Sequence, residues 1–99
     1  MSVLIFDKAD FFVPNAFSPN NDGRNDKLKI AAPGIESFQY FRIFNRWGNL
    51  VFETSNSSIF WDGTFKGMAQ PAEVYSWFAE GISASGNKIQ RNGQTLILR

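Results

Sequence analysis

The sequence predicts an all-β domain, an immunoglobulin-like antiparallel β-sandwich of about seven strands, and three observations support this fold class. Glycine, proline, asparagine and serine interrupt the chain so often that, outside residues 3–13, no stretch without them exceeds seven residues. An average helix takes about 11–12 residues, so helices have almost no room. Short apolar runs recur at close intervals, which is typical of sandwiches and barrels. The chain also holds 11 Phe, 3 Trp and 2 Tyr, large side chains that supply a small domain with a core.

Seven segments fit the strand pattern, at residues 3–6, 11–17, 27–31, 38–44, 50–53, 74–81 and 88–98. The first two come from one continuous run, in which apolar residues gather at both ends around the polar stretch 7–10. That clustering favours two short strands over one amphipathic helix. With 99 residues in all, the chain has room for a single core.

Two tight turns separate the middle strands. Gly48 and Asn49 tolerate positive φ, so the stretch 45–49 is expected to close a hairpin between the strands at 38–44 and 50–53. The stretch 61–64 contains Asp-Gly and predicts a second turn. Gly67 and Pro71 then indicate an irregular crossing to the strand at 74–81.

Two turn signals compete near the C-terminus, at Ser85-Gly86 and at Asn92-Gly93. We expect the turn at Ser85-Gly86, which places Gly93 within the last strand as a β-bulge. In this register Leu96 and Leu98 face the core, and Thr95 and Ile97 lie on the opposite face. Arg99 is expected to be free at the end of the strand.

Composition excludes most catalytic machinery. The chain has no cysteine and no histidine, which removes thiol nucleophiles, imidazole bases and the usual zinc ligands. Its net charge of +1 is spread without a basic block, so no nucleic-acid partner is expected. No apolar run approaches the ~18 residues of a membrane-spanning helix, so no membrane insertion is expected, and the start does not read as a secretion signal.

Paired carboxylates could in principle hydrolyse a glycosidic bond, and Asp62, Glu73 and Glu80 are the candidates. A plain two-sheet sandwich of this length has no long loops with which to build a cleft. Acidic residues at turns are also favoured for backbone reasons. We therefore expect no enzymatic activity.

The loop around Gly23 is a candidate calcium site. Hard oxygen ligands stand at the spacing of the third, fifth and ninth positions of a calcium loop: Asn20, Asp22 and Asp26. Ser18 and Lys29 occupy the first and twelfth positions, so a helix-loop-helix calcium sensor is excluded. The alternative is a turn whose side chains bond their own backbone. No cofactor is required in either case.

Trp47 and Trp61 lie at predicted turns, where an indole either stacks on a sugar or packs against the end of the sandwich. Packing with a bonded indole N–H is the commoner arrangement, and we favour it. Arg42 and Arg46 are candidates to stack on these rings. With Trp77 as a third ring, a carbohydrate-binding or adhesive β-sandwich remains the alternative function.

Five motifs then occur in a fixed order: 13–26 (VPNAFSPNNDGRND), 43–48 (IFNRWG), 61–64 (WDGT), Val74-Tyr75 and 96–99 (LILR). Together they make the chain resemble the gliding motility-associated C-terminal domain family over residues 12–99. The resemblance implies an immunoglobulin-like sandwich at the C-terminus of large secreted or surface proteins of Gram-negative gliding bacteria. It also implies a type B sorting signal for the type IX secretion system. The family usually has a small residue, often Gly, before Val-Tyr, whereas this chain has Ala72-Glu73.

Under this resemblance, residues 12–99 form the sorting domain and residues 1–11 are an N-terminal strand or linker from a parent protein. Met1-Ser2 is expected to be the start of a fragment cut from that longer parent. The implied partners are the cargo domain in the parent chain and components of the type IX translocon. The implied location is the cell surface or the medium, after export through the outer membrane.

The terminal hairpin is the candidate recognition element, docking on the translocon by strand addition at an exposed edge. The candidate residues are Lys88, Arg91, Thr95, Ile97 and Arg99. A third reading is a spacer domain stabilised by calcium, in which the domain's melting temperature would rise with the ion.

Overall fold

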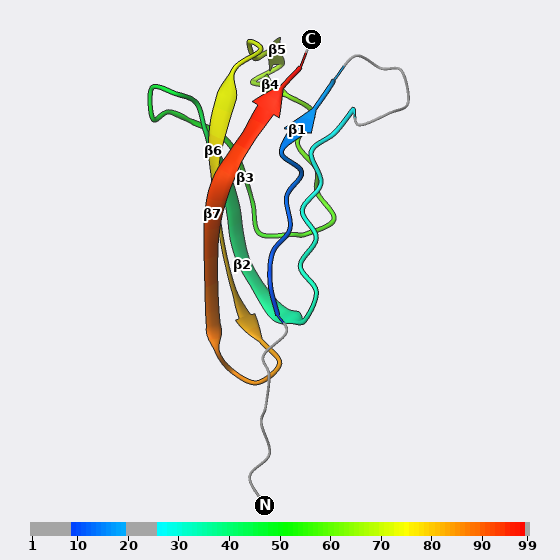
Figure 1. Cartoon of the computed structure of the whole chain (residues 1–99), viewed down its shortest axis with the longest axis vertical. Coiled ribbons are helices and arrows are strands. Elements are labelled where there is room, and N and C mark those ends of the chain that lie inside the picture. Colours follow the sequence, from blue (N-terminus) through cyan, green and yellow to red (C-terminus); the bar gives the residue numbers. More distant parts are fainter. Residues whose placement is uncertain (1–8, 20–25, 99) are drawn as a thin grey trace, which may run out of the picture.

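The structure is a computed structural model that describes residues 9–19 and 26–98. The described residues form seven strands and no helix, which confirms the all-β prediction (Figure 1). The strands are β1 (Ala16–Phe17), β2 (Ile35–Phe44), β3 (Leu50–Thr54), β4 (Thr64–Phe65), β5 (Met68–Ala69), β6 (Val74–Ser83) and β7 (Lys88–Ile97). The predicted strand at 3–6 lies outside the described residues.

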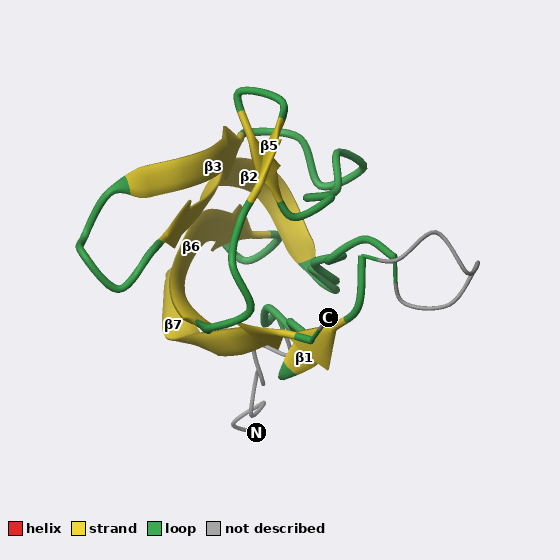
Figure 2. Cartoon of the chain, turned by 90° about the horizontal axis from the view of Figure 1, so that it is seen from above, coloured by secondary structure: helices red, strands yellow, loops and turns green. Residues whose placement is uncertain are grey.

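The main sheet has the strand order β1-β7-β6-β2-β3, and its three central strands have ten residues each. The pairs β2–β3, β6–β7 and β2–β6 are antiparallel, as predicted. Tight turns join β2 to β3 and β6 to β7, whereas β2 and β6 are far apart along the chain. The pair of β1 with β7 is parallel, with Ala16 opposite Leu96, so the sheet is mixed rather than wholly antiparallel. Figure 2 shows this sheet curving from β3 around to β1, with loops on its inner side.

The second layer is made largely of irregular segments. Of the predicted strand at 11–17 only β1 forms a strand, and it joins the main sheet, while the predicted strand at 27–31 forms only isolated bridges. Phe12 pairs with Ala31 and Leu28 pairs with Trp61 as isolated bridges. The stretch 27–31 thus has a different partner at each end, and neither pairing extends into a ladder. The two-stranded sheet β4-β5 completes this layer. It forms in the region where the sequence predicts a turn at 61–64 and an irregular connection to the strand at 74–81.

The two layers enclose an aromatic core. The ring of Trp61 lies 5.5 Å from that of Phe17 and 5.2 Å from that of Tyr75, and the rings of Phe41 and Trp77 are 6.1 Å apart. All five side chains are buried. Among the described residues, no buried side-chain polar atom lacks a hydrogen-bond partner. The core therefore joins sheet and loops without leaving polar groups unpaired.

The packed core continues on the N-terminal side of the boundary predicted at residue 12. Ala9 and Phe11 are both 4% exposed and belong to the core cluster. The backbone N–H of Asp10 also donates to the carbonyl of Pro33 at 3.1 Å. Where the cargo portion of a parent protein would begin stays a prediction.

The predicted orientation of the last strand is wrong. Thr95 and Ile97 are each 1% exposed, whereas Leu98 is 45% exposed. Thr95 lies opposite Tyr75 in the β6–β7 register, and directly opposed residues point to the same face of a sheet. Because Tyr75 points into the core, Thr95 does so as well.

The turn at Ser85-Gly86 is confirmed, but the bulge at Gly93 is not. The Ser83 N–H donates to the Asn87 carbonyl at 2.9 Å, and Gly86 has a φ of 88°. The β6–β7 register is continuous, with Gly93 directly opposite Trp77. A Cβ at position 93 would lie 2.9 Å from the Trp77 Nε1 atom. Gly93 therefore leaves room for the indole ring.

Candidate recognition surface

The three carboxylates considered for catalysis are each engaged by a different neighbour. Glu80 lies 3.6 Å from the Lys88 ammonium and accepts a hydrogen bond from Gln90 at 2.6 Å. The Asp62 carboxylate accepts bonds from the hydroxyl of Thr64 at 2.6 Å and from its N–H at 3.0 Å. The Thr64 hydroxyl bond is the main cause that lowers the pKa of Asp62. These are turn and surface interactions typical of a structural role.

Only part of the candidate calcium loop falls within the described residues. Asn20 and Asp22 lie outside them, and Asp26 is partly buried just before Leu28. Within residues 9–19 and 26–98, no group of three or more Asp or Glu side chains could hold a metal ion. The calcium hypothesis stays a prediction.

The predicted recognition residues divide into two groups. Lys88 and Arg91 are exposed on β7, with ion pairs to Glu80 at 3.6 Å and to Asp10 at 2.9 Å. The side chains of Thr95 and Ile97 are buried in the core, so they are not presented on the surface of the folded domain. Arg99 lies outside the described residues.

On one edge, β7 pairs with β6 along its length. On its other edge the only described strand is β1, which pairs with β7 at Leu96 and Ile97. The segment before β1 follows this edge at intervals. The Thr95 hydroxyl donates to the Pro14 carbonyl at 2.9 Å, and the Arg91–Asp10 ion pair lies further along. No described strand pairs with the stretch 88–94 on this side. A sheet edge that the described strands leave unpaired is where a partner strand can add.

The three tryptophans have different environments. Trp61 and Trp77 are 1% and 7% exposed, as packing in the core predicts, and the Trp61 indole N–H donates to the Thr64 carbonyl at 2.8 Å. Trp47 is 73% exposed, so the preference for packing is wrong at this position. A flat sugar platform needs two exposed rings, and of the three tryptophans only Trp47 is exposed. The stacking predicted for Arg46 is confirmed, at 4.7 Å from the Trp47 ring, whereas Arg42 lies over Tyr40.

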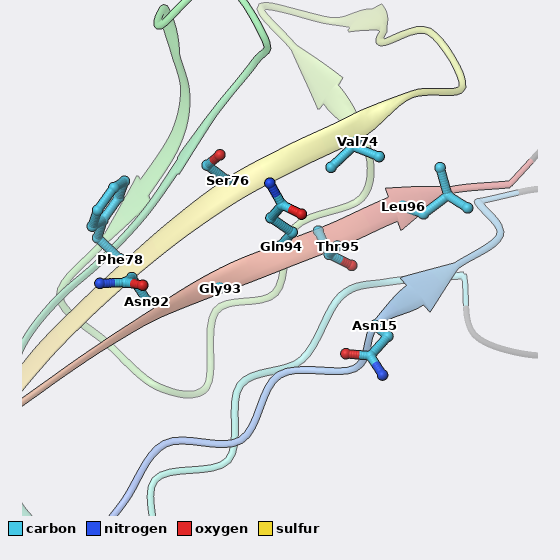
Figure 3. A pocket seen from close by; sticks show the side chains of 9 residues that line it. All are labelled: Asn15, Val74, Ser76, Phe78, Asn92, Gly93, Gln94, Thr95 and Leu96. Atoms are coloured by element: carbon cyan, nitrogen blue, oxygen red, sulfur yellow. The ribbon is translucent and has the colours of Figure 1, made fainter.

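A shallow groove runs over the outer face of β6 and β7, with Asn15 at its rim (Figure 3). It has a volume of about 690 Å³. Figure 3 shows how its main side chains lie along the two strands: Val74, Ser76, Phe78, Asn92, Gln94 and Leu96. None of these side chains is charged. An adjoining hollow of about 380 Å³ shares Ser76 and Phe78 and reaches the β2–β3 loop at Arg46.

Sequence reasoning missed this outer face. One sequence signal was present. The side chains of β6 alternate between buried and outward positions, and the outward positions include the apolar Val74 and Phe78. Both are more than 40% exposed, at 44% and 42%. Apolar residues on the solvent side of a strand are candidates for contacts with a partner.

A second apolar pocket opens between the N-terminal segment and the loop at 57–60, with a volume of about 860 Å³. Phe12 and Phe60 line it and are 58% and 37% exposed. Lys29 supplies its charged rim, and its ammonium lies 5.4 Å from the Phe60 ring. The hollows at these surfaces are lined by packing side chains rather than by convergent reactive groups.

Glu73 stands where the family usually has a small residue, and the structure accommodates it without backbone strain. Among the described non-glycine residues, Lys66 alone has a positive φ, at 53°. The Glu73 carboxylate lies 3.6 Å from the Arg46 guanidinium, and its carbonyl accepts the N–H of Ile97 at 3.1 Å. Glu73, which replaces the small residue usual in the family, thus forms an ion pair with Arg46 in the β2–β3 loop.

These features define a class of protein: a small all-β module with a closed aromatic core, whose candidate sites are all on its outside. Within the described part of the chain, no helix has the length and hydropathy needed to cross a bilayer. Residues 11–96 match the sequence model of the type IX secretion signal domain family, CHU_C, and the chain belongs to that family. This confirms the resemblance seen in the motifs. No curated protein matches the chain.

Proposed function

We propose that this domain directs an attached cargo protein through the type IX secretion system to the cell surface or the medium. The observation that carries the proposal is the family match, which extends over residues 11–96 and so covers nearly all of the chain. The partners are then a cargo domain in the parent chain and components of the translocon. The domain needs no cofactor for this role.

The structure supports recognition of the folded module by protein–protein contact. The described core is filled by packed rings, so the groups that distinguish the domain to a partner are on its surface. The stretch 88–94 of β7 offers backbone groups along an edge that no described strand covers, and it contains Lys88 and Arg91. Strand addition there would combine main-chain bonds with charge contacts. Thr95 and Ile97 would act indirectly, by holding β7 against the core.

Export of a reporter tests this function directly. The domain is fused behind a signal peptide and a fluorescent protein in a host with an active type IX system. We expect fluorescence at the cell surface or in the medium, and retention in the periplasm for the reporter without the domain or in a translocon-deficient host. A folded fusion that stays in the periplasm of the active host would contradict the proposal.

Truncation of residues 94–99 is a poor test of docking, because it removes core side chains. Thr95 and Ile97 are both 1% exposed, so their loss is expected to unfold the domain. A loss of export in the truncated domain would then report unfolding rather than recognition. Substitutions of exposed residues, checked by thermal melting, separate the two effects.

A further inference from the structure

We propose that the tip of the β2–β3 hairpin, Arg46 with Trp47, is an anchor that inserts into an apolar, carboxylate-rimmed pocket on a partner protein. This inference rests on the proposed function and assigns a second contact surface, away from the open edge of β7. In both Figure 1 and Figure 2 the loop between β2 and β3 projects from the rest of the domain. A projecting tip can enter a concave site.

The exposure of Trp47 is the first reason. At 73% it is the most exposed large hydrophobic side chain in the described part of the chain, while Trp61 and Trp77 are buried. Burying an indole is among the most favourable contacts that one side chain can make. Trp47 therefore keeps a large apolar surface available for a partner.

The tip is stabilised by hydrogen bonds within the loop. The Asn45 side-chain oxygen accepts the N–H groups of Trp47 at 2.9 Å and of Asn49 at 3.0 Å. The Asn45 N–H donates to the Asn49 carbonyl, and its carbonyl accepts the N–H of Gly48, both at 3.0 Å. Gly48 has a φ of 80°, which suits glycine. A preorganised loop loses little conformational entropy when it binds.

Arg46 sets the charge that the partner must complement. Its guanidinium lies 4.7 Å from the Trp47 ring centre and 3.6 Å from the Glu73 carboxylate. The Arg46 side chain is still 63% exposed, whereas that of Glu73 is 19% exposed. Arg46 is also the one charged residue among those that line the adjoining hollow. The surface presented around the indole is therefore cationic, and it fits carboxylates.

The hollow beside the tip extends the contact. Phe44 and Phe78 line it with their rings 5.6 Å apart, and Phe78 is 42% exposed. Tryptophan and arginine are enriched among the residues that dominate protein interfaces, especially next to apolar neighbours. A flat sugar platform would instead need a second exposed indole beside Trp47, and Trp61 and Trp77 are buried. The surroundings thus favour a protein over a glycan.

The export assay tests the anchor with a matched pair of substitutions, Trp47→Ala and Met68→Ala. Met68 is 71% exposed and lies on β5, so its truncation removes a comparable exposed apolar side chain elsewhere. We expect export to fall about tenfold or more for Trp47→Ala, as for an interface hot spot, and to stay unchanged for Met68→Ala. Trp47→Phe should recover part of the loss. Melting curves of the purified variants check that all three remain folded.

Competition provides a readout that does not depend on the variant being exported. The domain without cargo is produced in the periplasm of cells that export the wild-type fusion. We expect the wild-type domain to lower export of the fusion, and the Trp47→Ala domain to compete about tenfold less well. Equal competition by the two domains would overturn the anchor.

The outcomes separate the anchor from the proposed function. If the wild-type fusion is not exported, the proposed function fails. If it is exported and Trp47→Ala is exported equally well, the function holds and the anchor is wrong. Unchanged export together with a loss of polysaccharide binding in Trp47→Ala would assign the indole to a sugar and would likewise overturn the anchor.

Discussion

Thr95 lies directly opposite Tyr75 in the β6–β7 ladder, and both side chains are turned into the core, 1% and 0% exposed. The Thr95 hydroxyl donates to the Pro14 carbonyl, and the Tyr75 hydroxyl donates to the Pro71 carbonyl at 2.8 Å. This pair connects the central sheet to the segments that precede β1 and β6. The end of β7 is thus part of the core.

A charge at position 95 should therefore unfold the domain, whereas the same charge one residue earlier should not. We expect Thr95→Lys to lower the free energy of unfolding by more than about 3 kcal/mol, because it buries an unpaired ammonium. Gln94 is exposed, so Gln94→Lys should change stability by less than about 0.5 kcal/mol. Urea unfolding of both variants measures the difference. Equal stability of the two would place residue 95 on the surface.

A side chain at position 93 should disturb the packing of Trp77. The added Cβ of Gly93→Ala would stand 2.9–3.0 Å from three atoms of the indole, so the ring must move. We expect a loss of about 1–3 kcal/mol in stability and a shift in tryptophan fluorescence. Asn92→Ala, at an exposed neighbouring position, is the control and should leave both unchanged. A neutral Gly93→Ala would contradict the tight approach.

Removing the two cations of β7 should reduce export more than stability. Lys88 and Arg91 make exposed ion pairs, which are worth about 0–1 kcal/mol each. For the double variant Lys88→Ala, Arg91→Ala we expect a small fall in melting temperature and a fall of about tenfold in export. Lys27→Ala with Lys66→Ala removes two exposed cations outside β7 as a control. If both double variants export equally, these residues are not part of the signal.

The turn at Asp62 should make a small contribution to stability that depends on pH. The Thr64 hydroxyl and N–H bonds hold the pKa of Asp62 below its ordinary value of 3.8, so the ionised form is favoured in the folded state. This contribution is present above pH 3.8 and is lost as the pH falls through the lowered pKa. We expect the difference in melting temperature between wild type and Asp62→Asn to shrink from about pH 5 to about pH 2. A difference that is constant with pH would exclude this linkage.

The calcium hypothesis is tested by melting the domain with and without the ion. If Asn20, Asp22 and Asp26 bind calcium, the melting temperature should rise with its concentration and return when a chelator is added. Asp22→Ala should abolish the rise. Asp22→Asn separates charge from turn geometry, because the amide retains the turn's acceptor oxygen. Identical melting with calcium and with chelator would remove the site.

The sequence predicts the long strands well, because the signals for them are local. Glycine and asparagine mark the turns, and the apolar periodicity marks the strands between them. The strands β2, β3, β6 and β7 and the turns at 45–49 and Ser85-Gly86 appear nearly at their predicted bounds. Prediction was poorer for the second layer. Leu28 and Ala31 pair with different, distant segments, and such pairings leave little trace in local sequence.

By itself, the sequence determined the fold class, the hairpin turns and the family, since composition, turn residues and the order of five motifs all lie along the chain. Only the tertiary structure decided which face of β7 meets the core, because a shift of one residue exchanges the two faces and the alternation of Thr95 to Leu98 permits either. It also decided that Trp61 and Trp77 are buried while Trp47 is exposed. An indole is apolar enough for a core and polar enough for a surface, so its environment depends on what the rest of the chain brings against it.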